Sequence, residues 1–358
     1  MPTRTFRIAV IPGDGIGKEV VPEGLRVLEA LAAKSGGGLA FETEAFPWGS
    51  GYYLETGRMM DEDGLARLAE FHAIYFGAVG WPTVPDHVSL WGLRLAICQG
   101  FDQYACVRPV QLLPGITSPL RNATEETMDW VVVRENSEGE YAGIGGRNLA
   151  GRGQGTEIAT QTALFTEQGC ERIIRYAFEL ARTRKRRKVT SVTKDNAQQY
   201  AMTLWNDVFA RVAAEYRDVE TETWLVDAMA ARFVLRPDTL DVVVASNLFG
   251  DILSDLGSAL AGSMGIAASA NLDPERRRPS MFEPVHGSAP DIAGQGIANP
   301  IAAIWTVALM LDHLGLTDEA AAVMAAIRAT TAGGTLTPDL GGTASTREVG
   351  DAVLAHLR

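Results

Sequence analysis

Cysteine is scarce in this sequence, which argues against two classes of protein. Only three cysteines, Cys98, Cys106 and Cys170, occur in 358 residues, and none of them forms a C-x-x-C pair. An odd number of widely spaced cysteines is not typical of a disulfide-stapled secreted domain or of a thiolate metal site. We therefore expect a protein of a reducing compartment, the cytoplasm.

The chain also lacks long apolar runs and an excess of positive charge. No apolar run approaches the ~18 residues that a membrane-spanning helix needs, and residues 1–7 show no features of a signal peptide. The formal net charge of −12 argues against a protein that coats nucleic acid. We expect neither a membrane nor a nucleic acid as partner, and interpret the basic run at 182–188 as a solvated helix end.

The chain does contain an alternation of strand-like and helical segments. Apolar, strand-like segments at 7–11, 39–45 and 73–76 alternate with helical segments at 18–34 and 62–71. This order predicts an α/β fold with a largely parallel sheet. The glycine- and arginine-rich segment at 143–155 is expected to be a long loop or arm instead.

The segment Ala245–Asp255 gives the strongest signal for chemistry. It follows a buried strand at 242–244 and opens an amphipathic helix, on which Asp251 and Asp255 project from one face. Two carboxylates this close repel each other unless a cation joins them. Hard oxygen ligands at this spacing suit Mg²⁺ or Mn²⁺. The alternative, two solvated aspartates, is disfavoured by the apolar flanks.

Other polar residues follow expected strands. Arg108 and Arg134 stand at strand ends, where a guanidinium group can pair with both oxygens of a carboxylate. Lys194 follows a strand and opens a helix, and it could act as a base if its surroundings lowered its pKa. Asp227 has the same placement, and Tyr141 is a candidate proton donor. Each of these signals is weak alone.

Two glycine-containing loops are candidates for cofactor binding. Gly13–Gly17 could present backbone N–H groups to an anion, but it lacks the dinucleotide spacing, and a structural turn is an equal alternative. Glu283–Gly294 is stiffened by prolines, with a structural Ω-loop as its alternative. An acid at Asp291 could accept hydrogen bonds from a ribose diol and would repel a 2′-phosphate. The cofactor-binding candidates are His286, Gly287, Ser288, Ala289, Asp291 and Asn299.

The combination of these motifs resembles the β-decarboxylating dehydrogenases of the isocitrate and isopropylmalate dehydrogenase family. The resemblance spans nearly the full chain and rests on motifs in the family's order: Gly13–Gly17, Val133–Asn136, Thr193–Lys194, Val226–Met229, Asn247–Asp255 and Glu283–Gly294. Within the family, the tartrate and D-malate dehydrogenase branch is most similar at Ser89–Gly92, Phe101–Tyr104 and Ala268–Arg276.

This resemblance implies a two-domain fold with a large mixed, mostly parallel sheet flanked by helices. An outer, cofactor-binding domain would comprise residues 1–103 and 262–358, and an inner domain with the dimer interface and arm would comprise 104–261. The implied reaction is oxidation of a (2R)-hydroxy acid by NAD⁺ with Mg²⁺ or Mn²⁺, followed by loss of the carboxylate on C3. The resemblance also admits K⁺ as an accessory ion.

The resemblance also implies roles for individual residues. Asp251 and Asp255 would be metal ligands, joined by Asp227 of the partner subunit, so that a homodimer shares its active sites. The partner subunit's Lys194 would assist removal of the hydroxyl proton, and Tyr141 would protonate C3. Arg108 and Arg134 would hold the departing carboxylate. Asp291 stands where phosphate-binding relatives carry lysine, which implies NAD⁺ rather than NADP⁺.

Two positions depart from the family pattern. Relatives place another substrate arginine ten residues before Arg108, where this chain has Cys98. Arg94 lies one helical turn earlier and is the candidate to replace it. Asp195 stands beside Lys194, where relatives have a small residue, and it would favour a protonated lysine unless the two side chains point apart.

The segment Val84–Trp91 guides the choice of substrate. It is polar and bulky where an isopropyl-binding pocket should be small and apolar, which favours D-malate, converted to pyruvate and CO₂, or tartrate. A 3-isopropylmalate dehydrogenase is the alternative. A non-catalytic regulatory or nucleic-acid-binding relative that uses 182–188 is another, although the intact aspartates, lysine and tyrosine argue against it. The sequence leaves a dimer and a tetramer both open.

Overall fold

A computed structural model describes residues 3–149 and 151–357 of the chain. Its larger sheet has ten strands in the order β2-β1-β3-β12-β11-β4-β5-β10-β8-β9, and β6 pairs with β7 in a second sheet. The strands are β1 Arg4–Gly13, β2 Leu39–Ala45, β3 Ala73–Ala78, β4 Ala105–Gln111, β5 Asp129–Glu135, β6 Gly139–Asn148, β7 Ile158–Leu164, β8 Lys188–Thr193, β9 Glu220–Leu225, β10 Val242–Ala245, β11 Ala268–Leu272 and β12 Ser280–Pro284.

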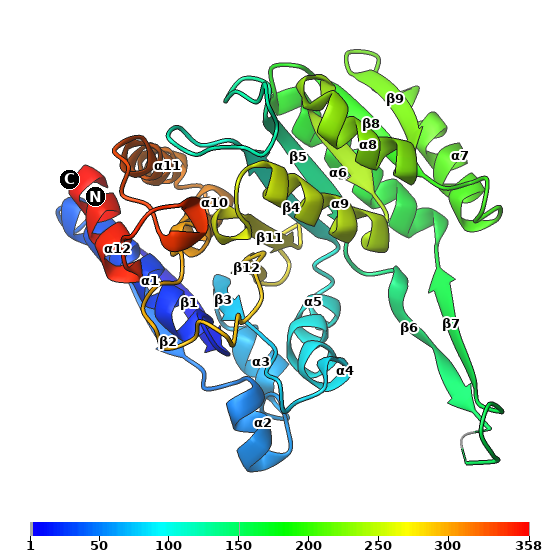
Figure 1. The fold of residues 1–358 in the computed structure, drawn as a ribbon, viewed down its shortest axis with the longest axis horizontal. Coiled ribbons are helices and arrows are strands. Elements are labelled where there is room, and N and C mark those ends of the chain that lie inside the picture. Colours follow the sequence, from blue (N-terminus) through cyan, green and yellow to red (C-terminus); the bar gives the residue numbers. More distant parts are fainter. Residues whose placement is uncertain (1–2, 150, 358) are drawn as a thin grey trace. The chain divides into compact units, whose positions relative to one another are not determined.

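Helices flank this sheet (Figure 1), and the predicted α/β class with a mixed, mostly parallel sheet is confirmed. A π-helical turn, Leu90–Arg94, lies between α4 and α5. The α-helices are α1 Gly17–Lys34, α2 Ser50–Thr56, α3 Gly64–Leu68, α4 Asp86–Ser89, α5 Leu95–Gly100, α6 Glu167–Thr183, α7 Ala201–Ala213, α8 Val226–Leu235, α9 Asn247–Leu260, α10 Ile301–His313, α11 Thr317–Ala332 and α12 Thr346–Leu357.

The described chain divides into two compact units. The first contains Val107–Asp129 and the described parts of Met1–Gln103 and Gly257–Arg358, and the second contains Tyr104–Cys106 and Trp130–Leu256. We expected a boundary at residues 103 and 104 and another at 261 and 262. The division differs from this expectation mainly at Val107–Asp129, which groups with the first unit.

In the first unit, buried parallel strands are covered by helices. β3 is buried along its whole length, and it runs parallel to β1 on one side and to β12 on the other. A strand buried on both faces explains the nearly continuous apolar sequence of β3. α1, α10, α11 and α12 pack against one another, and α10 also contacts β3, β11 and β12.

In the second unit, β5, β10, β8 and β9 form a parallel array. α6 packs against β8 and β10 and against α7. The buried residues of α6 recur every three or four positions, from Cys170 to Ala181, which is the pattern of a helix with one face in a core. Thr166 caps this helix, because its hydroxyl accepts a hydrogen bond from Gly169 N at 2.9 Å. The C-terminal ends of these strands meet at one edge of the array.

Two local expectations were wrong, and a third was met in part. The segment at 143–155 was expected to be a long loop or arm; its first residues, to Asn148, belong to β6, which pairs antiparallel with β7. Arg108 lies within β4 rather than after a strand. Lys194 does follow β8, but it opens no helix, since α7 begins only at Ala201.

Candidate active site

The carboxyl edge of the parallel array in the second unit collects the polar residues of the candidate site. Arg134 is near the end of β5, and the neighbouring strand β10 leads directly into α9, which carries Asp251. Further along the same edge, Lys194 follows β8 and Asp227 follows β9. Loops and helix starts at this edge of a parallel sheet are where α/β proteins place their ligands.

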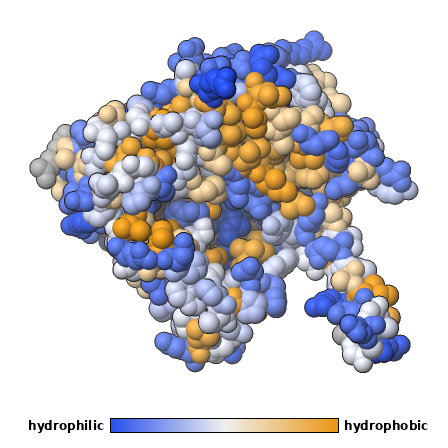
Figure 2. Space-filling view, in the orientation of Figure 1, coloured by the Kyte–Doolittle hydropathy of each residue, from blue (hydrophilic) through white to orange (hydrophobic). Residues whose placement is uncertain are grey.

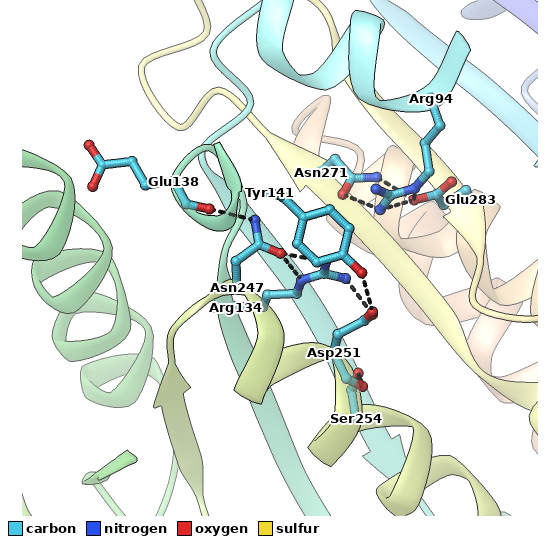
Figure 3. A network of polar contacts seen from close by, with 9 residues as sticks. All are labelled: Arg94, Arg134, Glu138, Tyr141, Asn247, Asp251, Ser254, Asn271 and Glu283. Carbon is cyan, nitrogen blue, oxygen red and sulfur yellow. Dashed lines mark hydrogen bonds and ion pairs between the residues drawn. The ribbon is translucent and has the colours of Figure 1, made fainter. Parts of the chain in front are cut away.

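Asp251 is the centre of the first group, which Figure 3 shows. Its Oδ1 atom accepts a hydrogen bond from Arg134 Nη1 at 2.5 Å, and its Oδ2 atom accepts one from the Tyr141 hydroxyl at 3.3 Å. The Arg134 guanidinium also lies 5.2 Å from the centre of the Tyr141 ring. The structure therefore brings together three of the predicted site residues.

Asn247 orients Arg134, and the sequence analysis did not single it out. Its Oδ1 atom accepts hydrogen bonds from Arg134 Nε at 2.9 Å and Nη2 at 2.5 Å, and its Nδ2 atom donates to the Glu138 carbonyl at 3.3 Å. Gly250 lets the two elements approach, because a Cβ there would lie 2.7 Å from Arg134 Cβ. The signal that could have found Asn247 is its position at the first residue of α9, directly after a buried strand.

Glu135 fixes the turn that leads to Tyr141. Its carboxylate accepts hydrogen bonds from Ser137 N at 2.8 Å, from the Ser137 hydroxyl at 2.5 Å and from Glu138 N at 2.7 Å. Burial nevertheless raises the pKa of Glu135, against the opposing effect of these hydrogen bonds. A turn held at three points places the start of β6, and with it Tyr141, in a defined position.

Lys194 and Asp227 form the second group. Lys194 Nζ lies 2.8 Å from Asp227 Oδ1, and the Asp227 side chain is 66% exposed. The hydrogen bond from Lys194 is the main reason why the pKa of Asp227 lies below its usual range. Asp195 points elsewhere, because its Oδ2 atom accepts a hydrogen bond from Asn206 Nδ2 at 3.0 Å. The neighbouring carboxylate therefore does not pair with Lys194.

Asp255 lies one turn after Asp251 on α9 and is exposed. Within residues 3–149 and 151–357, no three His, Cys, Asp or Glu side chains lie close enough to one another to hold a metal ion. Asp251 and Asp255 thus stand as two oxygen donors on one helix.

The two remaining predicted substrate residues, Arg94 and Arg108, are buried in the first unit. Arg94 Nε donates to Glu283 Oε1 at 2.8 Å, and its Nη2 atom donates to Asn271 Oδ1 at 3.2 Å (Figure 3). Asn271 Nδ2 also donates to Glu283 Oε1, at 2.7 Å, which closes the triangle. Arg94 therefore belongs to an intramolecular ion pair, and its role toward substrate stays a prediction, as does that of Arg108.

The predicted cofactor loop follows β12 in the first unit. His286 Nδ1 lies 2.9 Å from the Gly287 carbonyl oxygen, and its Nε2 atom is buried and has no hydrogen-bond partner among the described residues. Burial lowers the pKa of His286, so its ring is neutral at pH 7. A side chain at Gly287 would meet open space, and Asp291 is exposed.

The other three predicted residues of the loop differ in their surroundings. Ser288 is buried, and its carbonyl oxygen accepts a hydrogen bond from Ile16 N at 2.9 Å. Ala289 has a φ of +40°, a left-handed conformation that costs a residue with a Cβ roughly 1–2 kcal/mol. Asn299 holds α10, since its Oδ1 atom accepts from Ile301 N and its Nδ2 atom donates to Asp339, both at 3.0 Å.

The glycine turn Gly13–Gly17 packs against this loop. Gly15 has a φ of +50°, and a Cβ there would lie 2.0 Å from the Ser288 carbonyl oxygen. The carboxylate of Asp14 is used internally: it accepts hydrogen bonds from Ser50 N at 2.8 Å, from the Ser50 hydroxyl at 2.6 Å and from Gly80 N at 2.9 Å. These contacts give the turn a structural role.

Three of the six basic residues in the run at 182–188 form ion pairs within the chain. Arg184 Nε lies 2.5 Å from the buried Asp241, Arg182 Nη2 lies 2.8 Å from Asp218, and Lys188 Nζ lies 3.1 Å from Glu222. The nucleic-acid-binding alternative thus loses much of the charge on which it rested. In addition, no helix of the described residues is long and apolar enough to cross a membrane.

A family model described as isocitrate/isopropylmalate dehydrogenase matches residues 7–353. The chain belongs to the isocitrate/isopropylmalate dehydrogenase family. A solved structure of this family, isocitrate dehydrogenase from Methylococcus capsulatus, aligns with a TM-score of 0.88 at 35% identity and covers 99% of each chain.

Curated relatives of the dehydrogenase narrow the family assignment to one branch. The chain is 59% identical over 350 residues to a probable tartrate dehydrogenase/decarboxylase of Agrobacterium vitis, covering 98% of this chain and 95% of the relative. It is 53% identical to a tartrate dehydrogenase/decarboxylase of Pseudomonas putida (99% and 98%) and 52% identical to a decarboxylating D-malate dehydrogenase of Escherichia coli K12 (98% and 98%). The predicted family, branch and enzyme type, a decarboxylating dehydrogenase, are confirmed.

Proposed function

We propose that the protein oxidises and decarboxylates a small (2R)-hydroxy acid with NAD⁺ and Mg²⁺ or Mn²⁺, and that D-malate and tartrate are its preferred substrates. The observation that carries this proposal is the Arg134–Asp251–Tyr141 group. It joins a carboxylate-binding cation, an oxygen donor for a metal and a proton-donating hydroxyl within hydrogen-bond distance. The tartrate and D-malate relatives support the same substrate class.

The donor set on α9 fits a hard divalent cation. Asp251 and Asp255 supply only carboxylate oxygens, which Mg²⁺ and Mn²⁺ prefer, and no cysteine or histidine is part of the set. Asp251 is 30% exposed, so a cation can reach it from solvent. We propose that Asp227 of the partner subunit completes the set. K⁺ stays an accessory prediction.

The loop after β12 fits NAD⁺. A neutral His286 that donates from Nδ1 to the Gly287 carbonyl must carry its lone pair on Nε2, because only one ring nitrogen is then protonated. This buried acceptor requires a donor, and a ribose hydroxyl or an exocyclic amine of adenine would supply one. The exposed carboxylate of Asp291 supports NAD⁺ over NADP⁺, since it would repel a 2′-phosphate.

The chain's own residues would then divide the remaining work. When bound, the two cofactors supply Lewis-acid polarisation of the substrate oxygens and acceptance of the hydride. Arg134, oriented by Asn247, would hold a substrate carboxylate, with Arg108 as the proposed second cation. Lys194, as a neutral amine, would accept the hydroxyl proton, and Asp227 would stabilise the ammonium group that forms. Tyr141 would return a proton to C3 after CO₂ departs.

We further propose a homodimer in which each active site borrows Lys194 and Asp227 from the other subunit. Leu235 at the end of α8 is 73% exposed and Ile252 on α9 is 56% exposed, beside the predicted metal ligands. Figure 2 shows apolar surface over these two helices. Exposed apolar side chains next to a site are typical of a surface that another protein covers.

Steady-state kinetics test the substrate class. The purified protein is freed of metal with a chelator and assayed with NAD⁺ and Mn²⁺ on D-malate, meso- and L-tartrate, 3-isopropylmalate and isocitrate. We expect D-malate or tartrate to give the highest kcat/KM and the metal-free protein to be inactive. A kcat/KM for 3-isopropylmalate about tenfold above that for D-malate, equivalent to about 1.4 kcal/mol, would overturn the substrate assignment. Full activity without metal would overturn the metal assignment.

A further inference from the structure

A cationic cavity lies in the first unit, and none of the site residues assigned above lines it. Its volume is about 340 Å³, and its lining joins three consecutive arginines, Arg276–Arg278, to two histidines, His72 and His313. Phe6 and Phe71 add aromatic surface. Three adjacent arginines are notable in a chain whose formal net charge is −12.

The topology places this cavity at the opposite sheet edge from the cofactor loop. His72 directly precedes β3, and the arginine run lies just before β12, which runs parallel to β3 with Ser280 beside Ala73. The predicted cofactor loop follows the other end of β12. A strand rises about 3.3 Å per residue, so the five residues of β12 separate its two ends by roughly 13 Å.

The turn that carries the arginines is rigid. The buried Asp273 carboxylate accepts hydrogen bonds from the backbone N–H groups of Arg277 at 2.8 Å and Arg278 at 2.9 Å. Arg276 has a φ of +56°, a conformation that favours glycine or asparagine over arginine. An arginine with this backbone conformation lowers the stability of the fold, and backbone strain of this kind concentrates at ligand-binding sites.

Only the middle arginine is neutralised by the chain. The Arg277 guanidinium lies 3.3 Å from Asp273, 3.3 Å from Glu275 and 3.7 Å from Asp102. For Arg276 and Arg278, which are exposed, no acidic partner lies within ion-pair distance anywhere in 3–149 or 151–357. The cavity therefore presents two uncompensated guanidinium groups beside aromatic rings.

We propose that this cavity binds a small molecule that carries a phosphate or diphosphate group. The planar guanidinium fork matches phosphate oxygens, and two of them on one rigid turn can hold a multiply charged anion that a single carboxylate would not satisfy. Phe6, which is only partly buried, would add contact area if the phosphate carries a ring. The site is independent of the proposed dehydrogenase activity.

Titration calorimetry on the full-length protein tests this site. Pyrophosphate and AMP are titrated separately in the presence of saturating NAD⁺, which keeps AMP out of the predicted cofactor loop. The test variant is Arg276→Gln/Arg278→Gln, and the control is Arg121→Gln/Arg217→Gln, which removes the same charge from exposed arginines elsewhere. Both variants are first compared with the parent protein by thermal unfolding.

We expect at least one probe to bind to the parent protein. Its Kd should rise about tenfold or more in the test variant, because each charge-assisted hydrogen bond contributes substantially to the free energy of binding. The Kd should change little in the control variant. Tighter binding of AMP than of pyrophosphate would assign a nucleoside phosphate, and the reverse order a free phosphate compound. Absence of binding by both probes at 1 mM, roughly the weakest affinity of interest, would overturn the proposal. So would equal Kd values in the two variants.

Discussion

Asp251 accepts hydrogen bonds from two residues with different proposed tasks, Arg134 and Tyr141. Replacing Tyr141 with phenylalanine keeps the ring beside the Arg134 guanidinium and removes only the hydroxyl. We expect Tyr141→Phe to lower the rate of C3 protonation by about 10²-fold or more. The rate of hydride transfer should fall much less. Parallel assays of NADH, pyruvate and oxaloacetate from D-malate would show this as NADH formed in excess of pyruvate. Equal losses in both steps would remove Tyr141 from the role.

Lys194 determines the protonation behaviour of Asp227. In Lys194→Met, the pKa of Asp227 should rise toward its ordinary value, because its hydrogen-bonded cation is gone, and kcat should fall about 10²- to 10⁴-fold. Lys194→Arg is the matched control, since it keeps the charge and thus the low pKa of Asp227 but replaces the proposed base. Carboxyl-resolved NMR titration and kcat measure the two effects. An unchanged kcat in both variants would contradict the proposed role.

At the scale of single residues, the sequence predicted which residues belong to the candidate site better than it predicted the contacts between them. Arg134, Tyr141 and Asp251 were each predicted, and they do lie together. Asn247 was missed because an amide has no distinctive spacing, and only the fold shows that it faces Arg134. Whether Asp195 meets Lys194 also depended on a partner eleven residues away, Asn206.

Among the elements, the turn after β1 is held by one carboxylate. Asp14 is buried and binds Ser50 and Gly80, so removal would leave buried N–H groups without an acceptor. We expect Asp14→Ala to lower the free energy of unfolding by about 2–4 kcal/mol and Asp14→Asn by less, as measured by urea denaturation. A raised KM for NAD⁺ at unchanged stability would instead support an anion-binding role for this turn.

His313 lies in the last turn of α10, where the helix dipole favours a protonated ring. Burial outweighs the dipole and, aided by Arg276, lowers the pKa of His313 to about 4. Because the unfolded chain binds this proton more readily, His313 favours folding fully above about pH 6.5 and loses this contribution as the pH falls toward 4. Between pH 6.5 and 4, the free energy of unfolding should fall less in His313→Gln than in the parent protein, by on the order of 2 kcal/mol. Urea denaturation at several pH values checks this.

Sequence periodicity located the long elements and failed where composition was ambiguous. α1 was predicted at 18–34, within one residue of its observed start, because its apolar residues recur on one face that is buried in a core. The glycine-rich composition of residues 143–148 left a loop and an arm both open, and the structure shows the end of a paired strand, β6. Pairing with β7 explains that composition, since a Cβ at Gly145 would lie 2.2 Å from the Thr160 carbonyl oxygen.

At the scale of the whole molecule, the proposed sharing of active sites between subunits predicts complementation between inactive variants. Lys194→Met and Asp251→Asn should each be inactive. In a mixed dimer with borrowed Lys194, one site carries both substitutions and the other neither. Statistical exchange of subunits should therefore restore about a quarter of the parent activity in a symmetric dimer. Mixing after mild dissociation, followed by the D-malate assay, measures it. No recovery despite exchange, verified by native mass spectrometry, would show that each site is built from one chain.

The sequence predicted the family and the fold class, because both depend on motif order and on strand–helix alternation along the chain. The unit boundaries were harder to predict. Val107–Asp129 groups with the first unit although it lies between two segments of the second, and no glycine- or proline-rich linker marks the crossings. Chain crossings of this kind depend on which neighbours a segment packs against, which local sequence does not encode.

The Arg94–Glu283–Asn271 triangle has a consequence for the acids that the enzyme accepts. Because this guanidinium already has an internal counter-anion, an incoming carboxylate can engage it only by exchange, displacing Glu283 into a less favourable environment. A third carboxylate on a larger acid would carry this cost of displacement if it were to reach Arg94. We therefore expect Glu283 to act as an internal competitor that disfavours acids with a third carboxylate.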